Sequence, residues 1–112
     1  MNNELKKKLA EQILNFTICG NDDSFVEELE EGRYSKWGGG AAYLIDFRTN
    51  GNYQTNLRES IKELDFIKDV KIVEVEKDYM RIEIYTKEQK CEKILVNVDD
   101  KDYNFILVEW EE

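Results

Sequence analysis

The chain has 112 residues, of which 41 % are hydrophobic and 37 % are charged, and its formal net charge is -9 at pH 7. This length and apolar content predict a single folded domain over residues 1–112. Histidine is absent, which excludes Ser-His-Asp and Cys-His catalysis and histidine-ligated zinc. The acidic balance argues against direct contact with nucleic acid, which depends on Lys and Arg, and favours a basic protein as partner.

Residues 4–17 are predicted to form an amphipathic helix, because apolar side chains recur there at helical spacing. Asn2 or Asn3 can cap its first turn. The apolar positions are interrupted by Glu11 and Gln12, so the segment lacks the continuous apolar stretch of a signal peptide. No stretch approaches the roughly 20 apolar residues that span a bilayer. We therefore expect no membrane contact and a cytoplasmic location.

A second, short helix is expected over residues 24–31. Ser24 and Glu27 have the spacing of a capping box, and Gly32 follows as a helix terminator. This region holds the densest acidic run of the chain, from Asp22 to Glu31, with no basic residue inside it. A run of this kind on a structured surface is typical of a site for a basic partner.

Residues 33–40 are predicted to form a surface loop that presents Tyr34 and Trp37 beside three consecutive glycines. A large aromatic side chain on such a loop is a common binding anchor. The alternative role for Trp37 is to cover the edge of the core as a lid. The segment from Trp37 to Gly40 is also a candidate site for a small ligand. It lacks the Gly-Lys-Ser/Thr ending of a phosphate-binding loop.

Residues 41–49 are predicted to form a strand, followed by a turn at residues 50–52. A third helix is expected to begin at Thr55 or Asn56, because Asn56 and Glu59 again have the spacing of a capping box.

From Val70 to the end, apolar and polar residues alternate, which predicts four strands joined by short links. The predicted fold class is α+β: a four- to five-stranded, mostly antiparallel sheet with a C-terminal β-meander, and two to three helices packed on one face. The other face would carry acids interleaved with aromatic side chains. Lys71, Arg81 and Lys93 lie on or near that face, so cross-strand pairing that neutralises its charge is the alternative to a binding surface.

The remaining side chains give no sign of a chemical site. Cys19 and Cys91 lie far apart and are expected to be reduced, structural thiols. The aspartates near residues 22 and 99 lack the alternation of a calcium-binding loop. We expect no metal, no cofactor and no catalytic residue.

The sequence supports the hypothesis of a small acidic protein that inhibits a basic, nucleic-acid-handling protein by occupying its cationic surface. Nuclease-immunity proteins and phage anti-defence proteins, including anti-CRISPR proteins, are compact and acidic in the same way, which is an analogy in size and charge. The alternatives are an enzyme or ligand-binding protein that uses the loop from Trp37 to Gly40, and a homo-oligomeric assembly protein. The expected partner contacts are Asp22, Asp23, Glu27, Glu28, Glu30, Glu31, Tyr34, Trp37, Glu74, Glu76, Glu83 and Tyr85.

Overall fold

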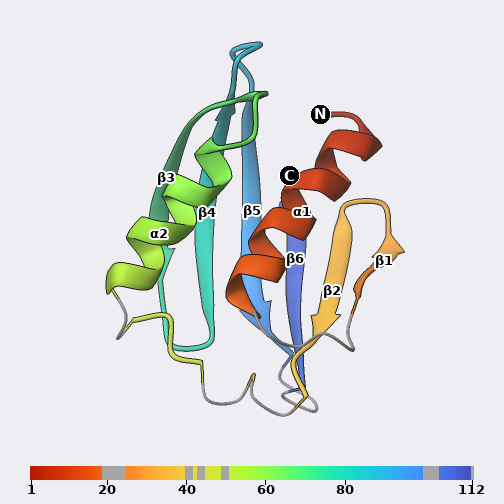
Figure 1. Cartoon of the computed structure of the whole chain (residues 1–112), viewed down its shortest axis with the longest axis vertical. Helices are drawn as coiled ribbons and strands as arrows, with labels where there is room; N and C mark the ends of the chain where they lie inside the picture. Colours follow the sequence, from red (N-terminus) through yellow and green to blue (C-terminus); the bar gives the residue numbers. More distant parts are fainter. Residues whose placement is uncertain (19–24, 40–41, 43–44, 49–50, 100–103, 112) are drawn as a thin grey trace.

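The computed structural model describes residues 1–18, 25–39, 42, 45–48, 51–99 and 104–111. The order of its elements is α1 (Asn3–Thr17), β1 (Val26–Glu30), β2 (Arg33–Trp37), α2 (Gly51–Lys62), β3 (Ile67–Val75), β4 (Tyr79–Thr86), β5 (Cys91–Val98) and β6 (Phe105–Glu111). The strands form one sheet in the order β1-β2-β6-β5-β4-β3, and each of its pairings is antiparallel. Both helices cover the same face of this sheet (Figure 1). We call the opposite face the open face.

The α+β class and the C-terminal meander are confirmed. Strands β3 to β6 follow one another along the chain and pair as neighbours, as the alternating pattern predicts. Their apolar positions form the core with one face of each helix, and the side chains of Ile82, Ile94 and Ile106 are among those fully buried. The described part of the chain has six strands and two helices, where four to five strands and two to three helices were predicted.

The first helix agrees closely with its prediction. Its N-cap is Asn2, whose side-chain Oδ1 accepts a hydrogen bond from the Leu5 N–H at 2.9 Å. Leu9 and Ile13 lie on its buried face against the sheet. The C-terminal end is held by Lys36 of β2, whose Nζ donates to the Ile18 carbonyl at 3.0 Å and to Asn15 Oδ1 at 2.9 Å.

The prediction of a helix over residues 24–31 is wrong in its described part, and the prediction of a loop over residues 33–40 is wrong at residues 33–37. Residues 38 and 39 lie outside the strands. Residues 26–30 and 33–37 are strands that form a hairpin around the two-residue turn Glu31-Gly32. Gly32 lies in this turn with φ +81°, a conformation that glycine adopts without steric cost. Burial decides the outcome, because β2 pairs with β6 and places Tyr34 fully inside the core.

The segment before the second helix also differs from its prediction. The expected strand over residues 41–49 does not form in its described part, where Ile45 and Asp46 are irregular and Phe47 and Arg48 lie in a turn. Residues 41, 43–44 and 49 of that range lie outside the described residues. Helix α2 begins at Gly51, so the expected turn is wrong at residues 51–52 and the expected capping box at Asn56 lies inside the helix.

The two edges of the sheet differ. β1 is a short edge strand of 5 residues, with a register shift between Glu28 and Glu30. β3 is the opposite edge, has 9 residues, and contains two register shifts, between Ile67 and Asp69 and between Ile72 and Glu74. Such irregularities twist an edge strand and interrupt its row of hydrogen-bonding groups.

Candidate functional site

The glutamates of the β1–β2 hairpin (residues 26–37) lie on both faces of the sheet edge. Glu27 pairs in register with Ser35, and Glu30 with Arg33, which places both glutamates on the open face. Glu28 is opposite Tyr34 and therefore lies on the helix-covered face, and Glu31 lies in the turn. All four glutamates are exposed. The edge of the sheet is thus acidic on either side of the β1 backbone.

Most of this acidic group lacks a compensating cation. Arg33 Nη1 contacts Glu30 Oε1 at 2.9 Å, and Arg33 Nε lies 3.5 Å from Glu109 Oε1. Among the described residues, no ion pair reaches Glu27, Glu28 or Glu31. The nearby Lys36 is buried and donates to groups at the end of α1, so it does not pair with these acids. The negative charge of the hairpin is therefore largely uncompensated within the described chain.

The charge of these acids also affects the pKa of Tyr34, which lies inside the core. Burial raises the pKa of the Tyr34 hydroxyl, and the negative charges of Glu28 and Glu31 raise this pKa further. The side chain is fully buried, so the prediction that Tyr34 contacts a partner from the surface is wrong. Trp37 is 43 % exposed and stands at the end of β2, opposite Phe105 of β6. It belongs to a strand and not to a glycine loop.

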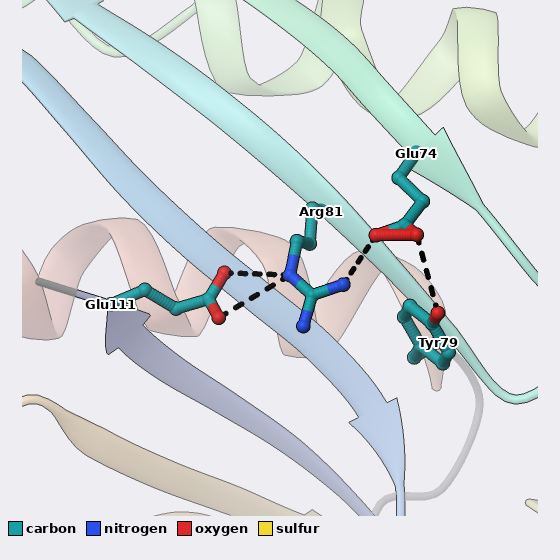
Figure 2. A network of polar contacts seen from close by, with 4 residues as sticks. All are labelled: Glu74, Tyr79, Arg81 and Glu111. Carbon is teal, nitrogen blue, oxygen red and sulfur yellow. Dashed lines mark hydrogen bonds and ion pairs between the residues drawn. The ribbon is translucent and has the colours of Figure 1, made fainter.

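The acids of the open face form internal contacts instead. Figure 2 shows Arg81 of β4 between Glu74 of β3 and Glu111 of β6, in front of the sheet with a helix behind it. Arg81 Nη1 is bonded to Glu74 Oε1, and its Nε donates to Glu111 Oε1 at 3.1 Å. Tyr79 Oη donates to the other oxygen of Glu74 at 3.3 Å. The hydrogen bonds that Arg81 donates to Glu74 and, with a smaller effect, to Glu111 raise the pKa of Arg81.

Glu83 also forms an internal contact on this face. It accepts a hydrogen bond from Tyr85 Oη at 2.9 Å, and this contact, more than burial, raises the pKa of Tyr85 to about 12. Lys71 Nζ lies 5.5 Å from the centre of the Tyr85 ring. Glu76 follows β3 in an exposed turn and is not part of this arrangement. The structure therefore separates the predicted contacts of the sheet face into three groups: Glu74, which is paired with Arg81; Glu83 and Tyr85, which are hydrogen-bonded to each other; and Glu76, which lies in a turn.

Other parts of the predicted site lie elsewhere. Asp22 and Asp23 are outside the described residues, as is Gly40. Gly38 is buried and donates its N–H to the Asn104 carbonyl at 2.6 Å, which fixes the chain after Trp37 against β6. Phe25 and Leu29 were not among the predicted contacts, and their side chains are 83 % and 47 % exposed near the two ends of β1.

Three surface hollows are lined by residues other than Tyr34 and Trp37. One of about 450 Å³ lies between Lys68, Tyr85 and Gln89 at the β3 side, and one of about 320 Å³ lies beside Leu5 and Phe66. The third, of about 580 Å³, lies at the end of β6 around Trp110. Across the described ranges, no group of three or more acidic or cysteine side chains is arranged to hold a metal ion.

Comparison of the chain with models of protein families, with curated proteins and with solved structures found no match in any of the three. Neither of the two described helices combines the length and the apolar character needed to cross a membrane.

Proposed function

We propose that this chain is a small acidic inhibitor that binds a basic, nucleic-acid-handling protein and occupies its cationic surface. One observation supports this function above the others: Glu27, Glu28 and Glu31 are exposed on the hairpin and have no ion pair among the described residues. In this proposal the chain acts by binding, catalyses no reaction and requires no cofactor.

The arrangement of charge suits this role physically. Surface charges act over about 8 Å at physiological salt, so acids fixed on one hairpin add their potentials where isolated acids do not. Complementary potentials raise the rate of association and discriminate against acidic partners. A protein that contacts phosphate groups presents Lys and Arg on its surface, and these same side chains pair well with carboxylates.

The test uses two triple variants with the same change in net charge. The hairpin variant combines Glu27→Lys, Glu28→Lys and Glu31→Lys. The control variant combines Glu59→Lys, Glu63→Lys and Glu88→Lys, at exposed positions of α2, its C-terminal turn and the β4–β5 turn. Each immobilised protein is exposed to a lysate of the native host, and retained proteins are identified by mass spectrometry.

We expect the wild-type and control proteins to retain the same basic, nucleic-acid-binding protein and the hairpin variant to lose it. With that partner purified, the hairpin variant should associate at least about tenfold more slowly at low salt. The wild-type chain should displace a labelled oligonucleotide from the partner. Two results would overturn the proposal. One is that both triple variants retain the partner equally, and the other is that the partner still binds nucleic acid in the presence of a saturating amount of this chain.

A further inference from the structure

One edge of β1 has no neighbouring strand among the described residues. β1 is the last strand of the sheet on this side and pairs only with β2. In an antiparallel pair, alternate residues direct their N–H and C=O groups towards the partner, so the intervening residues of β1 direct theirs away from β2. The register shift between Glu28 and Glu30 interrupts this row, and the outward groups on either side of the shift are a template to which an extended peptide can add as a strand.

Side chains around this edge restrict which peptide fits. Glu27 and Glu30 lie on the open face of β1, while Glu28 lies on the helix-covered face. A strand added beside β1 would therefore meet a carboxylate on each of its two faces. The exposed side chains of Phe25 and Leu29 add apolar contact area at the two ends of the strand.

These restrictions disfavour pairing of β1 with the β1 strand of a second copy. Pairing of β1 with another β1 would place glutamates beside glutamates, and like charges at neighbouring positions across strands are destabilising. The opposite combination, Lys or Arg on both faces of the incoming strand, is favoured by each of these contacts.

We infer that the basic partner is held through an extended segment, with Lys or Arg on both faces, that adds to the free edge of β1 as a further strand. This inference rests on the proposed function, because it specifies how the basic partner is recognised. Main-chain hydrogen bonds to β1 hold the segment in place whatever its sequence, and the glutamates select a segment that is basic.

Charges on an edge strand also have a purely protective use, since they prevent aggregation through the edge. Protection requires only that other strands are repelled. Strand addition requires in addition that a basic peptide binds and that its own backbone takes part. The two roles therefore differ in a measurable way.

The experiment uses the whole chain labelled with ¹⁵N and a synthetic peptide of about ten residues, long enough to cover β1. Adjacent pairs of Lys and Arg, whose two side chains fall on opposite faces of a strand, are separated by pairs of Val and Thr. A control peptide has the same sequence and charge but carries an N-methyl group on every backbone nitrogen, so neither of its edges can donate hydrogen bonds. Hydrogen exchange of the backbone amides is followed with each peptide.

We expect the unmodified peptide to bind at least about tenfold more tightly than the N-methylated peptide, and to slow exchange of the outward amides of β1 by at least about tenfold. Amides of β3 should exchange at an unchanged rate.

Equal binding of the two peptides would overturn strand addition. So would an unchanged rate of hydrogen exchange at the outward amides of β1 in the presence of the unmodified peptide. If both peptides bind equally and the hairpin variant binds neither, the acidic surface stands as a binding site and only the strand-addition inference fails. Absence of binding by either peptide also overturns strand addition, while capture from the host lysate still decides the proposed function separately.

Discussion

The glutamates of the β1–β2 hairpin and those of the open face differ in what surrounds them. On the open face, Glu74 and Glu111 share Arg81, and Glu83 accepts a hydrogen bond from Tyr85. On the hairpin, only Glu30 has a cationic partner, Arg33, in the described part of the chain. Acidic composition alone therefore does not identify a binding surface. The comparison indicates that one group of acids stabilises the fold and that the other remains available to a partner.

Because the hairpin acids form few contacts within the described chain, we expect the buried residue Tyr34, and not the charges, to anchor the hairpin. Tyr34→Ala should lower the free energy of unfolding by about 3–5 kcal/mol, the range for loss of a large buried aromatic side chain. The ring is fully buried and lies 5.9 Å from the Trp110 ring in an edge-to-face arrangement. Urea denaturation measures the change.

Tyr34→Phe is the matched control, because it keeps the ring and removes only the hydroxyl. That hydroxyl is buried and has no hydrogen-bond partner among the described residues. We expect the free energy of unfolding to stay the same or to rise by up to about 1 kcal/mol. A small loss for Tyr34→Ala, comparable with that of an exposed tyrosine, would show that β2 is not anchored as described.

A smaller effect separates the two groups of acids directly. The double variant Glu74→Gln, Glu111→Gln should lower the urea midpoint, because both carboxylates that contact Arg81 lose their charge. Its effect should be smaller than that of Tyr34→Ala and should shrink as salt is added, since these groups are partly exposed.

The matching double variant on the hairpin, Glu27→Gln with Glu31→Gln, should leave stability within about 0.5 kcal/mol of the wild type or raise it slightly. These substitutions remove like-charge repulsion and break no ion pair in the described structure. If the hairpin variant loses as much stability as the open-face variant, the distinction between the two groups is wrong.

The smallest predicted effect is on the ionisation of single tyrosines. Glu83→Gln should lower the pKa of Tyr85 from about 12 towards the ordinary tyrosine value of about 10, because the hydrogen bond to the carboxylate is the main cause of the raised pKa. Tyr53 is the internal control. Its pKa is also raised to about 12, but mainly by burial, and should not change. NMR titration of ¹³C-labelled tyrosines measures both values.

The sign of the linked stability effect follows from these pKa values. The folded pKa lies above the unfolded one, so the contribution of Tyr85 is complete below about pH 10 and is lost as the pH rises towards 12. Glu83→Gln should weaken this alkaline loss. An unchanged Tyr85 pKa in this variant would show that Glu83 is as free as the hairpin acids.

The sequence predicted the meander because its period is unambiguous. In β4, for example, Met80, Ile82 and Ile84 alternate with Arg81 and Glu83, and the apolar set is buried as expected. The first helix was equally clear, including its cap at Asn2. Local pattern and tertiary packing agree in these elements.

The hairpin was missed because its local signals favour a helix. Ser24 and Glu27 mimic a capping box, and the acidic run gives no alternation of apolar and polar residues. β2 is also misleading, since its buried side chains include the charged Lys36 as well as Tyr34. The available signal was Gly32, the second residue of a two-residue turn between two segments of strand length. The alternation places Arg81 near the acidic face and so raises cross-strand pairing as an alternative, but its partners Glu74 and Glu111 and the uncompensated charge of the hairpin depend on cross-strand register.

The two register shifts in β3 have a consequence for the size of any complex. They interrupt the edge of the sheet opposite β1 twice, whereas β1 contains a single register shift, so β1 is the edge better suited to strand addition. Under the proposed function, a complex formed through β1 is closed and holds one partner molecule for each copy of this chain. It should not grow into chains at high concentration, and inhibition should be complete when the two proteins are present in equal number.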